Sequence, residues 1–143
     1  MSTRKHRLHM AKLETIEGIG PKIADQLREA GVGSTDALLA KGASPSGRKA
    51  IAESTGMSPK LVLRFVNHAD LMRIKGVGGE YAELLEAAGV DTVKELAQRN
   101  AANLHAKLAE ANADKKLVRQ LAAAEQVEQW VEQAGTLERV VTY

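Results

Sequence analysis

An internal repeat constrains this chain more than any other feature of its sequence. The segment that begins at Leu13 recurs at Leu71, at an offset of 58 residues that holds without a gap as far as Leu38. Ten pairs in this span are identical: Leu13/Leu71, Ile16/Ile74, Gly18/Gly76, Gly20/Gly78, Ala24/Ala82, Leu27/Leu85, Ala30/Ala88, Gly31/Gly89, Val32/Val90 and Leu38/Leu96. The match then loosens, and the offset shrinks through the loops until Lys60-Leu61-Val62 parallels Lys116-Leu117-Val118. The chain is therefore predicted to hold two copies of one small unit.

Helix signals recur inside each copy. Pro21 has the place of a first helical residue, and Gly31 follows the last one. Further helices are expected to begin at Ser34 or Thr35, Ser44-Pro45, Ser58-Pro59, Thr92 with Glu95, Asn100, and Asn112 or Asp114, the last of these running through Leu121. A final helix carries Val127, Trp130 and Val131. Aromatic residues make up only 3% of the chain and no segment alternates like a strand, so the predicted fold is all-α, with two repeated helical units.

The predicted organisation has four parts: a basic flexible arm over 1–12, a first unit over 13–70, a second unit over 71–134 and a short tail over 135–143. The arm holds Arg4, Lys5, Arg7 and Lys12 and no acidic residue. Residues 13–70 hold seven basic and seven acidic residues, whereas residues 71–143 hold nine basic and eleven acidic ones. The arm is either a solvated terminus or a nonspecific electrostatic anchor for a polyanion.

Two glycines, separated by one apolar residue, mark the same place in each copy. They are Gly18-Ile19-Gly20 and Gly76-Val77-Gly78. Glycines at this spacing let the backbone turn tightly, and the helix that follows would present its free N–H groups to a phosphate. Ile19 and Val77 are expected to point inward and hold the turn in place.

The pattern around these glycines resembles the helix-hairpin-helix motif, because the following Ala and Leu and the second copy all agree with it. The span 13–134 is similar to an uncharacterised bacterial family, the domain of unknown function 4332. The residues of this chain that carry the similarity are Ile16-Glu-Gly-Ile-Gly, Arg48-Lys49, Asp70-Leu-Met-Arg-Ile-Lys-Gly-Val-Gly, the segment from Leu84 to Leu96, and Trp130. Membership in that family implies a fold and little about function.

The broader motif implies binding to the DNA backbone without sequence specificity, through N–H groups around Gly18 to Gly20 and Gly76 to Gly78. Lys22 matches a position where the motif often has a basic residue. The second copy departs there, because it has Glu80, which repels a phosphate, and Lys75 is its only nearby compensation. The second hairpin is thus the weaker candidate. The offset of 58 residues is also longer than that of the compact double motif that straddles a DNA minor groove, which argues against that geometry here.

Other kinds of chemistry find little support. The chain has no cysteine, which excludes disulfides and thiol nucleophiles and favours a reducing, cytoplasmic setting. No apolar run approaches the roughly 20 residues of a membrane span, and no secretory signal is recognisable. His6 and His9 lack nearby carboxylate or cysteine ligands, and no Walker loop or nucleophile triad is present. We therefore expect no enzyme activity, no cofactor, no metal site and no small-molecule substrate.

Two classes of function remain open. The first is a DNA-backbone-binding accessory protein with duplex DNA as its partner, which Lys22 and the arm favour. The alternative is a non-catalytic protein–protein interaction or scaffold module, which the acidic second unit favours. Arg48-Lys49 is expected on a solvated face and Trp130 in the core. The candidate nucleic-acid-binding residues are Gly18, Ile19, Gly20, Lys22, Lys75, Gly76, Val77, Gly78, Arg4, Lys5, Arg7 and Lys12.

Overall fold

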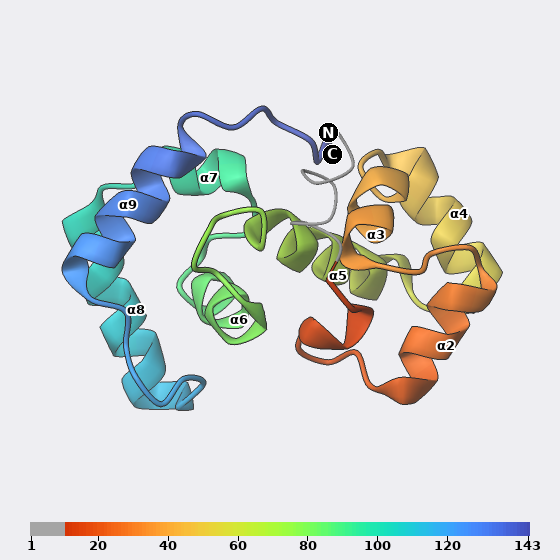
Figure 1. The fold of residues 1–143 in the computed structure, drawn as a ribbon, viewed down its shortest axis with the longest axis horizontal. Coiled ribbons are helices and arrows are strands. Elements are labelled where there is room, and N and C mark those ends of the chain that lie inside the picture. The colour runs from red at the N-terminus through yellow and green to blue at the C-terminus, as the bar shows by residue number, and fades with distance from the viewer. Residues whose placement is uncertain (1–10) are drawn as a thin grey trace. The chain divides into compact units, whose positions relative to one another are not determined.

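The structure is a computed structural model, and it describes residues 11–143. Arg4, Lys5 and Arg7 of the arm lie outside the described residues. Across residues 11–143 the chain forms eight α-helices and one 3-10 turn, with no strand, as the coiled ribbons of Figure 1 show. The all-α prediction is confirmed for this part of the chain.

Proline and serine residues set the helix boundaries of the first unit. Its elements are η1 (Leu13–Thr15), α2 (Pro21–Glu29), α3 (Thr35–Lys41), α4 (Pro45–Thr55) and α5 (Pro59–Leu71). The hydroxyls of Ser34, Ser44 and Ser58 accept hydrogen bonds from backbone N–H groups in the first turns of α3, α4 and α5. Each cap therefore satisfies an N–H group that the helix itself cannot pair.

The second unit follows the same order but ends differently from the prediction. Its helices are α6 (Gly79–Ala87), α7 (Val93–Ala97), α8 (Ala101–Lys115) and α9 (Ala124–Ala134). The prediction of a helix that begins at Asn112 or Asp114 is wrong, because both residues lie inside α8. The amide of Asn112 instead bonds both backbone groups of Val118, and Lys116 adopts a left-handed conformation with φ 53° that ends the helix. Asn112, which the sequence suggested as a helix cap, thus stabilises the loop that follows α8.

Backbone hydrogen bonds repeat at the offset of 58 residues that relates the two sequences. The N–H of Ile19 donates to the carbonyl of Ile16 over 3.1 Å, and that of Val77 donates to Ile74 over 3.0 Å. The same offset relates further donor–acceptor pairs: Ala24 to Gly20 and Ala82 to Gly78, Gly31 to Arg28 and Gly89 to Glu86, Val32 to Leu27 and Val90 to Leu85, Leu38 to Ser34 and Leu96 to Thr92. The two copies therefore share their backbone pairing through this whole segment.

The final helices of the two units correspond at a larger offset than the sequence comparison predicted. The predicted partner of Lys60-Leu61-Val62, residues 116–118, lies between helices. In α5 and α9 the buried residues instead match at an offset of 65: Val62/Val127, Phe65/Trp130 and Ala69/Ala134. The offset grows because α8 has 15 residues where α4 has 11, and because a loop over 116–123 follows it.

The chain divides into two compact units. The first holds the described residues up to Asp70 together with Val140–Tyr143, and the second is Leu71–Arg139. Part of the segment predicted as a tail is thus joined to the first unit, where the N–H of Thr142 donates to the carbonyl of Ala43 over 2.8 Å. Ala11, predicted in the arm, accepts a hydrogen bond from the N–H of Thr35 over 3.0 Å.

Arg48 is buried, so the prediction that Arg48-Lys49 lies on a solvated face is wrong for Arg48. Its side chain is only 7% exposed, whereas Lys49 is exposed as expected. The guanidinium donates to the carbonyls of Gly42, Ala43 and Thr142 over 2.9, 3.0 and 2.7 Å. Five fixed donors allow an arginine to satisfy several carbonyls at once, so Arg48 joins the α3–α4 connection to the C-terminal segment of the first unit.

Candidate nucleic-acid interface

The first glycine turn presents its backbone to solvent. Gly18 has φ 94°, a left-handed conformation that favours glycine, and Gly20 is the extended residue that precedes α2. Both glycines are exposed, whereas Ile19 between them is only 4% exposed. The predicted inward position of Ile19 is confirmed, and it anchors the turn while the glycine backbone stays accessible.

The start of α2 has the features of an anion site. Gly20 has no side chain to cap the helix, and Pro21 has no N–H of its own. The N–H groups of Lys22 and Ile23 therefore stand at the positive end of the helix dipole without a capping side chain. The ammonium of Lys22 is exposed and forms no ion pair with any described residue. A phosphate oxygen at this place would meet both N–H donors and a positive charge.

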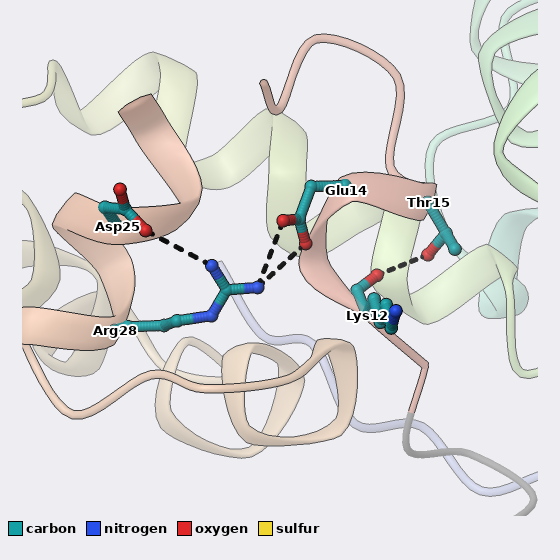
Figure 2. A network of polar contacts seen from close by, with 5 residues as sticks. All are labelled: Lys12, Glu14, Thr15, Asp25 and Arg28. Atoms are coloured by element: carbon teal, nitrogen blue, oxygen red, sulfur yellow. Dashed lines mark hydrogen bonds and ion pairs between the residues drawn. The ribbon is translucent and has the colours of Figure 1, made fainter. Parts of the chain in front are cut away.

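A polar network ties the residues before the turn to the helix after it. Arg28 in α2 donates to both carboxylate oxygens of Glu14 in η1, over 2.9 and 3.1 Å, and to Asp25 over 3.4 Å (Figure 2). The hydroxyl of Thr15 donates to the carbonyl of Lys12 over 2.6 Å. Because Arg28 is already paired with two carboxylates, Lys22 is the better candidate for a phosphate contact. Lys12 itself is exposed beside this network.

The pKa of Glu14 gives this network a pH dependence. A hydrogen bond from its own backbone N–H, followed by the hydrogen bond from Arg28, lowers the pKa of Glu14 below its ordinary value of 4.5. The resulting stabilisation is fully present above 4.5 and is lost as the pH falls through the lowered value in the folded state. We expect Glu14→Gln to lower the unfolding midpoint slightly near neutral pH and not at all in strong acid. Thermal melts of both proteins across this range measure the difference.

The control for this prediction is Glu29→Gln. Glu29 is an exposed carboxylate of α2, the helix that carries Arg28, and makes no ion pair with a described residue, so its substitution should leave the midpoint nearly unchanged at each pH. A midpoint difference for Glu14→Gln that persists unchanged in strong acid would contradict the role assigned to the carboxylate.

The second glycine turn has the same backbone with the charges in reverse order. Gly76 has φ 94°, Gly78 precedes α6 with φ −93°, and Val77 is 4% exposed, which confirms its predicted inward position. Here an exposed lysine, Lys75, precedes the turn and an exposed glutamate, Glu80, follows it. In the first turn Glu17 occupies the position of Lys75, and Lys22 that of Glu80. The helix start of the second unit is therefore less suited to a polyanion.

An aromatic ring from the last helix of each unit lies beneath its turn. A Cβ added at Gly18 would lie 3.4 Å from Cε1 of Phe65, and one added at Gly76 would lie 3.2 Å from Nε1 of Trp130. In the second unit the side chain of Gln133 also accepts a hydrogen bond from the N–H of Lys75 over 2.8 Å. Sequence reasoning placed Trp130 in the core, which its 2% exposure confirms, but did not connect any of these side chains with the turns.

The remaining features of the described residues add no second site. A shallow polar cleft lined by Gln26, Glu29, Ala30, Ser54 and Thr55 lies at the opposite end of α2 from the turn. Within residues 11–143, no three His, Asp or Glu side chains come together as metal ligands, and no helix has the length and apolar character of a membrane span.

The family model described as Domain of unknown function (DUF4332) matches residues 17–137, which include both glycine turns. Searches of the curated proteins and of the solved structures found no match.

Proposed function

We propose that this chain, which belongs to the DUF4332 family, binds the phosphate backbone of duplex DNA through its first glycine turn. In this proposal both turns are helix-hairpin-helix motifs, and the protein is a non-catalytic accessory factor. The basic residues of the arm would add affinity without sequence specificity. The observation that carries the proposal is the uncapped start of α2, where exposed glycine backbone, open N–H groups and an exposed Lys22 that has no ion pair with a described residue coincide.

The first unit contains a natural comparison for this claim. Pro59-Lys60 starts α5 as Pro21-Lys22 starts α2, and both lysines are exposed. At α5, however, the hydroxyl of Ser58 accepts the N–H of Leu61 over 3.1 Å. Lys60 is therefore a matched control for Lys22. Both are exposed lysines after a proline, but a backbone N–H beside Lys60 is capped by Ser58, whereas those beside Lys22 have no side-chain cap.

Reversing the charge of Lys22 is expected to weaken duplex binding. Lys22→Glu should cost about 1 kcal/mol, roughly a fivefold rise in Kd, if the lysine makes one charge-assisted phosphate contact. It should also reduce the log–log salt slope by about 1. Glu80→Lys should leave folding intact and raise affinity, because it removes a repulsive charge at the second turn. Anisotropy titrations of a labelled duplex at several salt concentrations measure these effects.

Lys60→Glu changes the net charge by the same amount and should weaken binding less than Lys22→Glu. Equal losses for the two variants would mean that only the overall charge matters and that the first turn is not a site. If the protein binds neither duplex, single-stranded nor branched DNA at low salt, the nucleic-acid proposal is wrong. The scaffold alternative, which the excess of acidic over basic residues in the second half of the chain favours, would then take its place.

A further inference from the structure

Trp130 carries a hydrogen-bond donor to the second turn that the first turn lacks. The indole is 2% exposed, and its ring centroid lies 5.2 Å from that of Tyr81 at a tilt of 59°. Its Nε1 is the atom that a Cβ at Gly76 would meet, at 3.2 Å. The buried ring therefore directs its one polar atom at the turn.

No residue in the described part of the chain accepts a hydrogen bond from this indole N–H, and its nitrogen is not among the buried polar atoms that lack a partner. An indole N–H is a donor only, and it bonds water or a ligand oxygen where the protein offers no acceptor. In the first unit the corresponding position is occupied by Phe65, whose ring edge is apolar and needs none. The donor is thus a property of the second turn alone, and it is available there to water or to a ligand oxygen.

The surroundings of this N–H favour an oxygen acceptor. α6 begins at Gly79 after Gly78, which provides no side-chain cap, so the first N–H groups of the helix are open. Gly79 also has an N–H of its own, unlike Pro21 in the first unit. The backbone N–H of Lys75 is already bonded to Gln133, and the side chain of Lys75 is exposed beside the turn. Donors predominate here in spite of Glu80.

We propose that the indole N–H of Trp130 and the open start of α6 together bind a phosphate oxygen at the second turn. This inference rests on the proposed function, and it gives the second turn a contact of its own instead of a purely structural role. An uncharged donor suits the second turn, because the turn has Glu80 at the position where the first turn has Lys22. The indole N–H can bond a phosphate oxygen without a basic residue at that position. The phosphate can belong to free inorganic phosphate or to the backbone of a duplex, and the two probes below separate these sources.

The chain has a single tryptophan, so its indole N–H gives one identifiable signal in a proton–nitrogen NMR spectrum. We expect this signal to shift and saturate as a short duplex is added to the full-length protein. A similar saturable shift with sodium phosphate alone would identify the site as one for free phosphate as well. If the indole signal stays still with both probes while amide signals near Lys22 shift with the duplex, this inference is wrong and the proposed function stands. If the amides near Lys22 also stay still, both are wrong.

A variant separates the donor from the ring. Trp130→Phe installs the ring that the first unit has at Phe65 and removes only the N–H donor and part of the ring volume. We expect it to raise the duplex Kd roughly two- to tenfold, the range of one hydrogen bond, with the helical circular dichroism unchanged. Tyr81→Phe is the control, since the Tyr81 hydroxyl donates to the carbonyl of Gln120 over 2.8 Å and not to the turn. Duplex affinity that Trp130→Phe leaves at the wild-type value would overturn the inference.

Discussion

Trp130→Ala is expected to lower the free energy of unfolding of the second unit by about 3–5 kcal/mol, the usual cost of removing a large buried aromatic side chain. Trp130 is 2% exposed and packs in a core with buried side chains from α6, α7, α8 and α9. Its loss would leave a cavity between the last helix and the turn at Gly76, where the indole Nε1 lies 3.2 Å from the place of an added Cβ. Small domains have only about 5–15 kcal/mol of stability, so much of the second unit's stability depends on this side chain.

Urea unfolding followed by circular dichroism measures this effect. Trp130→Phe keeps a ring in place and is expected to cost less than about 1.5 kcal/mol. A Trp130→Ala protein as stable as the Trp130→Phe protein would show that the indole does not fill the core in the way described.

Gly47→Ala is expected to destabilise the first unit by about 1–3 kcal/mol, although alanine is normally the better residue inside a helix by about 1 kcal/mol. Gly47 lies in α4, and a Cβ there would overlap the backbone carbonyl oxygen of Lys41. A backbone oxygen at the end of α3 cannot move aside as a flexible side chain would. The clash therefore forces α3 and α4 apart, and the usual sign of a glycine-to-alanine change in a helix is reversed.

The matched control is Gly33→Ala. No heavy atom lies within 4 Å of a Cβ added at Gly33, and the residue does not have a left-handed φ. This variant should be nearly neutral, or slightly stabilising because alanine restricts the unfolded chain. Thermal unfolding of both variants tests the comparison, and a Gly47→Ala protein at least as stable as the wild type would contradict the close approach of the two helices.

Most of the helix boundaries follow from local residues. Ser34, Ser44, Thr92 and Asn100 cap helices at the predicted places, since a side-chain oxygen beside its own helix start needs no distant partner. Asn112 has the same chemistry but bonds Val118 instead, because the same amide can hold a loop as well as cap a helix. Which role it takes depends on where the chain goes next, and a capping residue does not contain that information.

The sequence by itself determined the all-helical class and the glycine turns with their inward Ile19 and Val77. Each of these depends on residue spacing along one chain: the glycine φ, the apolar period and the caps act within a few residues. The lysine at one turn and the glutamate at the other are likewise read directly, so the candidate site could be outlined without coordinates.

Only the tertiary structure decided which distant side chains meet these turns. Phe65 and Trp130 lie beneath Gly18 and Gly76 because α5 and α9 pack there, and the longer α8 hides their correspondence from a gapless comparison. Arg48 is buried because carbonyls of Gly42, Ala43 and Thr142 converge on it, and Thr142 is 94 residues away. Contacts of this kind depend on packing across large sequence separations, where a residue's type states what it can bond but not what lies next to it.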